Sequence, residues 1–145
     1  MQVTNQLHKQ NYFNKNMSTT ISKLKKKLDK IFSEYIRRRN ANHLGFITCF
    51  TCGVKRHWKD RMQAGHFMTR AKMATRYCEY NVQNQCVSCN IYKNGCQYKF
   101  GVYLDERFGK GTAEEIEIRS NTIIKLNRID YEEAIEFYKR KLENL

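Results

Sequence analysis

Cys49-Phe-Thr-Cys52 and Cys86-Val-Ser-Cys89-Asn90 begin and end the stretch that organises this chain. Two C-x2-C pairs separated by a few dozen residues have the spacing at which four thiolates bind one zinc ion tetrahedrally. Ordinary buried cysteines would pack as small hydrophobic residues, but that interpretation leaves the repeated spacing unexplained. We therefore expect a structural Zn2+ ion bound by these four cysteines.

The other two cysteines, Cys78 and Cys96, have no partner at ligand spacing and are expected to be free thiols. No signal peptide and no apolar run of membrane-spanning length is visible, so the sequence predicts a cytoplasmic protein without a membrane partner. In a reducing cytoplasm, cysteines serve as metal ligands or free thiols rather than as disulfides.

The chain carries a formal net charge of +13 and a pI near 9.6, which indicates a polyanionic partner such as DNA. The charge balance is +8 in residues 1–48, +7 in residues 49–111 and −2 in residues 112–145. The basic surface therefore belongs to the first helix and the cysteine segment. DNA binding there is expected to weaken with salt, because it depends on counterion release.

Residues 18–42 are predicted to form a basic amphipathic helix, with Ser18 or Thr19 as its N-cap. Apolar residues recur at helical spacing, at Ile21, Leu24, Leu28, Ile31, Phe32, Tyr35 and Ile36. The opposite face is rich in Lys and Arg; Lys26 and Arg38 are candidates for phosphate contacts, although simple solvation explains such a face equally well. Residues 1–17 are expected to be a disordered tail before a single domain, residues 18–145.

The loop between the cysteine pairs contains a predicted β-hairpin. Residues 63–69 and 82–85 are expected to be its strands, with a short helix that begins near Asn90 and is broken by Gly95. Four basic side chains of the same segment are further candidates for DNA contacts: Arg70, Lys72, Arg76 and Lys93. Residues 45–95 are therefore predicted to be a zinc-bound core.

Residues 97–145 are predicted to be a helical extension of that core. Thr112 with Glu115, and Asp130 with Glu133, have the spacing of capping boxes at helix starts. Together with the first helix and the hairpin, these segments predict an α+β fold in which helices flank a small zinc-bound core.

Short motifs of the central segment resemble those of two groups of proteins. His66, Asn81 and an Asn directly after the last cysteine resemble the HNH, or ββα-metal, nucleases, with an ending similar to that of endonuclease VII-like members. A longer run resembles the NinG (Rap) family of lambdoid-phage recombination proteins more closely: Cys49-x-x-Cys52-Gly, Ala64-Gly-His66, Glu79-x-Asn81 and Gln85-Cys-Val-x-Cys-Asn90, followed by Lys93. The resemblance implies that the core is an HNH-like ββα-metal core with zinc knuckles.

The resemblance also implies catalytic roles for particular residues. His66 would act as general base, since a neutral imidazole accepts a proton near neutral pH. Asn81 would fix the hairpin loop or the imidazole, and Asn90 would offer its amide oxygen to a catalytic Mg2+ or Mn2+ ion. HNH enzymes commonly place Asp directly before this His, where the chain has Gly65. Glu79 is therefore the expected carboxylate ligand of that ion.

An alternative interpretation of Glu79 is a surface salt bridge beside Arg76. At the level of function, the resemblance implies a phage recombination endonuclease that hydrolyses phosphodiester bonds in branched DNA, such as Holliday junctions and D-loops, in the bacterial host cytoplasm. Two symmetric incisions favour a homodimer, and phage or host recombination proteins are candidate partners. Two other functions stay open: an HNH nickase that acts on ordinary duplex DNA, and a non-catalytic zinc DNA-binding module in which His66 is merely packed.

Overall fold

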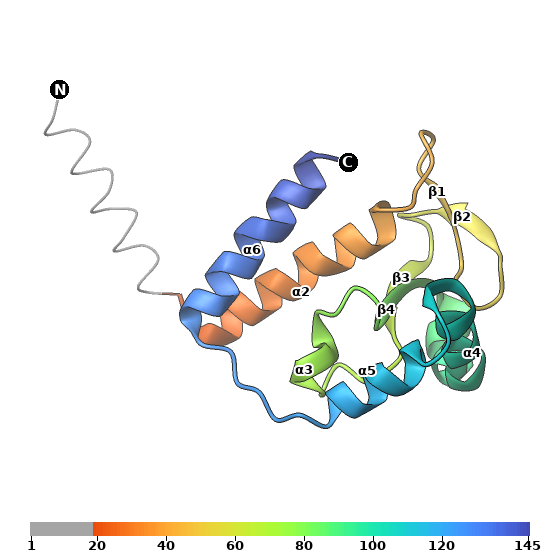
Figure 1. Cartoon of the computed structure of the whole chain (residues 1–145). Coiled ribbons are helices and arrows are strands. Elements are labelled where there is room, and N and C mark those ends of the chain that lie inside the picture. The colour runs from red at the N-terminus through yellow and green to blue at the C-terminus, as the bar shows by residue number, and fades with distance from the viewer. Residues whose placement is uncertain (1–18) are drawn as a thin grey trace, which may run out of the picture.

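Two long helices lie side by side and form one layer of the molecule (Figure 1). They are α2, Ile21–Arg38, and α6, Arg128–Glu143, and they run in the same direction. The structure is a computed structural model that describes residues 19–145. The tail predicted for residues 1–17 and the candidate N-cap Ser18 lie outside the described residues.

The sequence pattern of α2 explains its packing. The helix begins after Thr20, which is one or two residues later than the predicted caps. The Thr20 Oγ1 atom accepts a hydrogen bond from the Lys23 backbone N–H and so caps the N-terminus of the helix. One face of the helix is buried, through Leu24, Leu28, Phe32, Tyr35 and Ile36. This apolar stripe packs against Tyr131, Ile135 and Tyr138 of α6 and forms the largest of three hydrophobic clusters. The predicted amphipathic helix is therefore present, between narrower bounds than expected.

Two short antiparallel sheets carry the cysteine segment. In the first, β1, Phe46–Thr48, pairs with β2, Lys55–His57. In the second, β3, Met62–His66, pairs with β4, Val82–Cys86, so that His66 lies opposite Val82. The predicted β-hairpin is therefore confirmed, although its first strand ends at His66 instead of continuing to position 69. Helix α3, Met73–Arg76, lies within the loop that joins the two strands.

Irregular helical turns follow β4. A π-helix, η1, covers Ser88–Tyr92, and a 3-10 turn, η2, covers Asn94–Cys96. Gly95 has a φ of +79°, a conformation that glycine adopts at low cost, and it breaks the helix as the sequence predicted. Helix α4, Gln97–Phe108, then continues the chain.

The C-terminal region is helical, but its helix starts differ from the predicted capping boxes. Helix α5, Thr112–Ser120, begins after Gly111, an N-cap residue that has no side chain to cap with, and the Thr112 hydroxyl donates to the Gly109 carbonyl. Helix α6 has a capping box formed by Asn127 and Asp130, rather than by Asp130 and Glu133. The helical extension is confirmed, and the residues that cap it are corrected.

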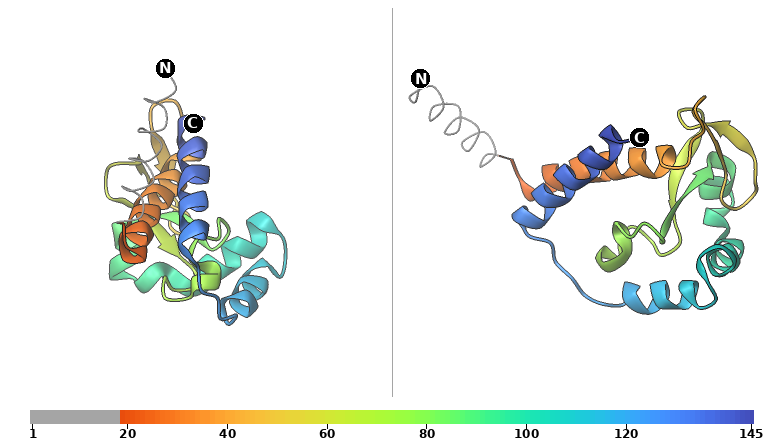
Figure 2. Two further views of the ribbon diagram at one scale, coloured as in Figure 1. Left: turned by 90° about the vertical axis from the view of Figure 1, so that its left-hand side faces the viewer. Right: turned by 45° about the horizontal axis from the view of Figure 1, so that its top comes forward.

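Three clusters of buried residues divide the interior. Beside the α2–α6 cluster, one surrounds the cysteines with Ile47 and Met62, and another joins Phe50 to α4 and α5. Figure 2 shows the segment after α5 extending back to the start of α6. The fold is thus mixed α+β, as predicted.

Among the described helices, none combines the length and hydrophobicity needed to span a bilayer.

Candidate metal centre and adjacent pocket

The four cysteines predicted as zinc ligands come together in space. Cys49 and Cys52 follow β1, and Cys86 and Cys89 lie at the junction of β4 and η1. Their Sγ atoms all lie within 4.8 Å of one another, and those of Cys52 and Cys86 are 3.7 Å apart. Tetrahedral zinc with Zn–S bonds of about 2.3 Å requires sulfur atoms roughly 3.8 Å apart. These four thiols can therefore hold a metal ion such as zinc.

The surroundings of the cluster stabilise at least one of the cysteines, Cys49, in its thiolate form. Cys49, Cys86 and Cys89 are buried, whereas Cys52 is exposed. Burial opposes ionisation of Cys49, but hydrogen bonds from backbone N–H groups, chiefly that of Cys86 at 3.3 Å, outweigh it and lower the Cys49 pKa to about 6. Burial raises the pKa of the Cys52 and Cys89 thiols. Cys78 is a free thiol outside the cluster, as predicted.

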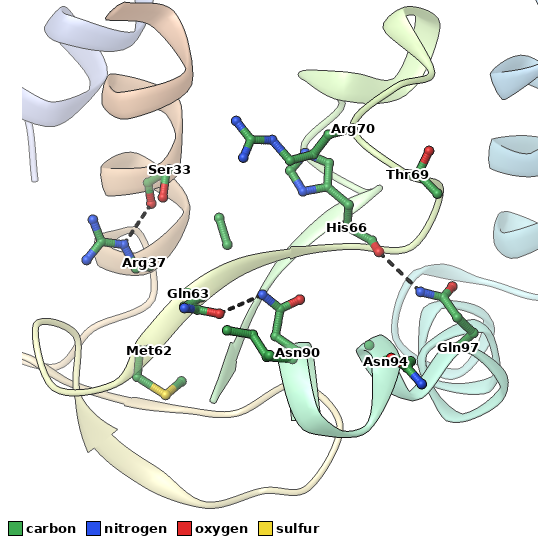
Figure 3. A pocket seen from close by; sticks show the side chains of 13 residues that line it. Ser33, Arg37, Met62, Gln63, His66, Thr69, Arg70, Asn90, Asn94 and Gln97 are labelled. Atoms are coloured by element: carbon green, nitrogen blue, oxygen red, sulfur yellow. Dashed lines mark hydrogen bonds between the residues drawn. The ribbon is translucent and has the colours of Figure 1, made fainter. Parts of the chain in front are cut away.

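A pocket of about 540 Å3 lies beside the cluster, between α2, β3 and the turns after β4 (Figure 3). It contains two of the predicted catalytic residues, His66 and Asn90, and the predicted DNA contact Arg70. The other residues that line it are Ser33, Arg37, Met62, Gln63, Ala64, Thr69, Ile91, Asn94, Gly95 and Gln97. None of these described lining residues is Asp or Glu, and two are arginines.

His66 ends β3 with its imidazole at the pocket. Its Nε2 lies 3.1 Å from the Arg76 backbone carbonyl, which only accepts hydrogen bonds, so Nε2 carries the proton of the neutral ring. Burial, and then the positive charge of Arg70, lowers the pKa of His66 to about 4. The ordinary histidine pKa assumed from the sequence does not hold here, and the imidazole is neutral at neutral pH.

Asn81 holds the loop that follows His66. Its side chain is fully buried; Oδ1 accepts from the Met68 N–H at 2.7 Å, and Nδ2 donates to the Met68 and Thr75 carbonyls at 3.0 Å each. The family resemblance implied that Asn81 fixes either the hairpin loop or the imidazole, and all three of these hydrogen bonds are made to the loop. The side chain does not line the pocket, so Asn81 acts on the site only through the backbone.

Asn90 follows the last cysteine and reaches the pocket from η1. Its Nδ2 donates to Gln63 Oε1 at 2.7 Å (Figure 3). The hydrogen bond uses the amide nitrogen, so the Asn90 carbonyl oxygen is the atom left to accept a proton or to hold an ion. Gln63 thereby sets the orientation of the predicted ligand.

Glu79 lies elsewhere, contrary to the predicted role as metal ligand. Its Oε1 accepts from Lys141 at 2.6 Å and from the Tyr138 hydroxyl at 3.2 Å, and its Oε2 accepts from Tyr35 and Arg39. It does not line the pocket of His66. The physical reason is charge pairing: Arg39, directly after α2, and Lys141 of α6 neutralise this carboxylate and tie both helices to the loop before β4.

Arg76 is also used inside the fold and does not extend to bind DNA as predicted. Its Nε and Nη2 donate to the two carboxylate oxygens of Asp29 at 2.9 and 2.6 Å, and only 10% of its side chain is exposed. This bidentate pair joins α3 to α2 and positions the Arg76 carbonyl that binds His66. The salt bridge between Arg76 and Glu79 considered from the sequence is absent among the ion pairs of the described residues.

The remaining predicted DNA contacts are placed on the surface. Arg70 is 59% exposed at the pocket mouth, and Lys26, Lys72 and Lys93 are exposed. Arg38 pairs with Glu34 at 2.9 Å and is half-buried.

Three residues of the site were missed by reasoning from the sequence. Arg37 and Gln63 line the pocket, and Gln85 lies behind Gly65 on β4. Gln63 and Gln85 are paired across the hairpin register, which a strand prediction gives. Their roles depend on side-chain directions that only the fold supplies.

An α+β protein with a candidate zinc centre beside a basic, histidine-containing pocket is the class that these features define. The family model described as Bacteriophage Lambda NinG protein matches residues 3–145. The chain therefore belongs to the NinG family of bacteriophage proteins.

Individual relatives come from several phages. Protein ninG of Escherichia phage lambda is 31% identical over 125 residues, which are 83% of this chain and 56% of that protein. Protein ninG of Salmonella phage P22 is 33% identical over 63% of this chain and 43% of the relative. The chain thus spans about half the length of these relatives. No solved structure matches this chain.

Proposed function

We propose that this chain is a DNA endonuclease that hydrolyses phosphodiester bonds in branched DNA during phage recombination, in the host cytoplasm. The observation that carries the proposal is the environment of His66: a neutral imidazole, oriented by a backbone carbonyl, in a pocket that also presents Asn90 and two arginines. Hydrolysis of a phosphodiester needs a base for water and positive charge for the transition state, and the pocket offers both.

His66 Nδ1 is the atom that would accept the proton. Because Nε2–H is donated to the Arg76 carbonyl, the lone pair of the neutral ring lies on Nδ1. Arg37 and Arg70 line the same pocket and would bind the phosphate oxygens as negative charge develops. Exposed Lys26, Lys72 and Lys93 would extend this contact along the DNA backbone.

The protein offers a suitable site for a structural zinc ion but not, by itself, for a catalytic divalent ion. The four cysteines fit a structural zinc ion that leaves no open position for water. A Mg2+ or Mn2+ ion would supply Lewis-acid chemistry in the pocket, but the residues there do not fit such an ion by themselves. Asn90 offers one neutral oxygen, and the described lining residues include no carboxylate. No chemical step above depends on that ion.

The preference for branched DNA rests on family membership and on the distribution of charge. The homologues are phage proteins named ninG, which the resemblance of the motifs connects to recombination. A basic surface that contacts phosphates reads DNA shape rather than base sequence. A homodimer would place two pockets for two incisions, and phage or host recombination proteins remain proposed partners.

A non-catalytic zinc DNA-binding module is the second candidate function. The absence of a carboxylate among the described residues of the pocket favours it, because catalytic metal ions are usually held by carboxylates. In that case, His66 would only pack against the Arg76 carbonyl.

Substitution of His66 separates the two functions. His66→Ala is expected to lower cleavage by about 100- to 10,000-fold while DNA affinity changes little, as loss of a general base does. His43→Ala is the matched control, because His43 is exposed and outside the pocket. Cleavage by His66→Ala at the parent rate would remove His66 from the chemistry. A parent protein that binds DNA without cutting it would favour the binding module.

A further inference from the structure

Two tyrosine side chains are exposed on the turns that follow the four-cysteine cluster. Tyr92 is the last residue of η1 and is 76% exposed, and Tyr98 lies in the first turn of α4 and is 88% exposed. A single exposed aromatic ring is ordinary on a protein surface. Two such rings on successive turns beside a candidate catalytic pocket form a candidate contact for a ligand of that pocket.

The chain neighbours of both tyrosines line the pocket. Ile91, directly before Tyr92, and Gln97, directly before Tyr98, are lining residues. Gln97 Nε2 also donates to the His66 backbone carbonyl at 3.4 Å, so the start of α4 lies beside the candidate base (Figure 3). A DNA strand with a phosphate in the pocket can therefore place a neighbouring nucleotide on these turns.

The segment that carries the tyrosines has no negatively charged side chain. Residues 80–104 contain no Asp or Glu, and an exposed lysine follows each tyrosine directly, Lys93 after Tyr92 and Lys99 after Tyr98. Aromatic rings interleaved with cations suit a single nucleic-acid strand, because the rings stack on bases and the cations contact phosphates. Tyrosine also serves in protein interfaces, but a basic segment without acidic residues favours a polyanion.

A small cavity beside Tyr92 adds two arginines to this surface. The cavity has a volume of about 110 Å3, and Arg56 and Arg61 line it together with Tyr92. Arg56 pairs with Asp60 at 3.6 Å, whereas Arg61 takes part in none of the ion pairs found among residues 19–145. A guanidinium without a carboxylate partner can bind a backbone phosphate while the ring beside it stacks on the attached base.

The tyrosine surface is defined by five residues: Arg61, Tyr92, Lys93, Tyr98 and Lys99. We infer that the tyrosine surface binds unpaired nucleotides of single-stranded DNA beside the pocket. A base inside a duplex must first be unpaired and unstacked at a cost in free energy, so the surface favours nucleotides that are already unpaired. The inference deepens the proposed function, on which it rests for DNA as the ligand: the preferred branch carries a single-stranded segment next to the bond that is cut.

Two matched oligonucleotides separate base stacking from charge. The zinc-loaded protein would be titrated, without added Mg2+, into labelled oligothymidylate and into a strand of the same length and charge whose bases are replaced by abasic sites. Fluorescence anisotropy measures both affinities. The parent protein should bind the base-bearing strand about fivefold to a hundredfold more tightly, because only that strand can stack on the tyrosines. Equal affinity for the two strands would overturn the inference.

Substitution of each tyrosine tests whether its ring carries that preference. Tyr92→Leu and Tyr98→Leu should each lower affinity for the base-bearing strand by about fivefold or more, and should leave affinity for the abasic strand unchanged. Tyr92→Phe and Tyr98→Phe keep the ring and should bind as the parent does. Phe137→Leu, which removes a partly exposed ring on α6, is the matched control. Leucine variants that keep the parent's preference, or phenylalanine variants that lose it, would also overturn the inference.

These measurements decide the inference separately from the proposed function, because they record binding and not cleavage. A protein that prefers the base-bearing strand but cuts no DNA supports the inference and contradicts the nuclease proposal. A protein that cuts branched DNA but binds both strands equally contradicts the inference alone. Because both rings are exposed, the variants should keep the zinc content and melting temperature of the parent. Should one of them lose zinc, the comparison of the two strands on the parent protein decides the inference.

Discussion

The surroundings of His66 set both its pKa and its tautomer. Burial and the charge of Arg70 lower its pKa, and the Arg76 carbonyl selects the tautomer. A base with such a low pKa is fully deprotonated at neutral pH but accepts protons less strongly than an ordinary histidine. A bound phosphate, being negative, would raise the His66 pKa toward the useful range.

The depressed pKa of His66 makes stability depend on pH. The unfolded chain, with an ordinary pKa near 6.5, binds this proton more readily than the folded chain with a pKa of about 4. The stabilising effect of the neutral ring is complete above pH 6.5 and is lost as pH falls toward 4, by on the order of 2–3 kcal/mol. Urea unfolding of the parent and of His66→Gln, which does not titrate, measures this difference. Parallel curves from pH 7 to pH 4 would contradict it.

Glu79 is predicted to matter for stability and not for metal binding. Glu79→Gln removes the charge that binds Lys141 and Arg39, and because the carboxylate is 30% exposed, the expected loss is only about 1–2 kcal/mol. Asp60→Asn is the control, since Asp60 forms an exposed pair with Arg56 at 3.6 Å. Chemical denaturation measures both variants. An increased Mg2+ requirement in Glu79→Gln, with unchanged stability, would restore the ligand role expected from the sequence.

At the scale of elements, the features that depend on residues close together in the sequence could be predicted from local sequence patterns. The apolar spacing of α2, the break at Gly95 and the strands that meet at His66 and Val82 could all be derived from the sequence. The paired C-x2-C spacing likewise predicted which thiols meet. Each of these depends on a short periodic or turn signal.

Features formed between distant elements could not be derived in the same way. Glu79 and Arg76 are charged residues of a loop, and nothing nearby in sequence shows that α2 and α6 supply their partners. The cap of α6 is Asn127, whose Oδ1 accepts from the Ile129 and Asp130 N–H groups while Asp130 Oδ2 accepts from the Asn127 N–H, so both residues share the cap. Gln85 became important only through its contact with Gly65 across the hairpin.

The four-cysteine cluster is predicted to hold the two small sheets together. Cys86→Ser should lower zinc content well below one ion per chain and expose the cluster formed with Ile47 and Met62, because structural zinc contributes about 10–16 kcal/mol in small sites. Cys78→Ser is the matched control outside the cluster. Metal analysis and thermal melting of purified protein measure the effect. A Cys86→Ser protein with full zinc and the parent melting temperature would contradict this prediction.

At the scale of the whole molecule, the sequence that contains α2 and the cysteine core is basic, whereas the C-terminal part that contains α5 and α6 is weakly acidic. The charge balance is +8 in residues 1–48, +7 in residues 49–111 and −2 in residues 112–145. Of the described basic residues, Arg37 and Arg70 line the pocket. DNA should therefore approach from the side of α2 and the pocket, with α6 turned away from the phosphates.

Salt dependence tests whether this charge binds DNA. The logarithm of affinity should fall linearly with the logarithm of salt concentration, with a slope near −0.9 for each phosphate contacted. Lys72→Ala should reduce the slope by about one contact, whereas Lys139→Ala, on α6, should leave it unchanged. Equal slopes for the parent, Lys72→Ala and Lys139→Ala would place DNA on another surface.

Light scattering of the same samples tests the proposed homodimer.

Cleavage of matched DNA substrates tests the central claim most directly. The zinc-loaded protein would be given a four-way junction and a linear duplex of the same arm sequences, with Mg2+ or Mn2+, and single-turnover products would be compared with those of His66→Ala. The account predicts cuts near the branch point in the junction, little cutting of the linear duplex, and almost none by His66→Ala. Equal cutting of both substrates would favour a duplex nickase, and no cutting of either would contradict the nuclease assignment.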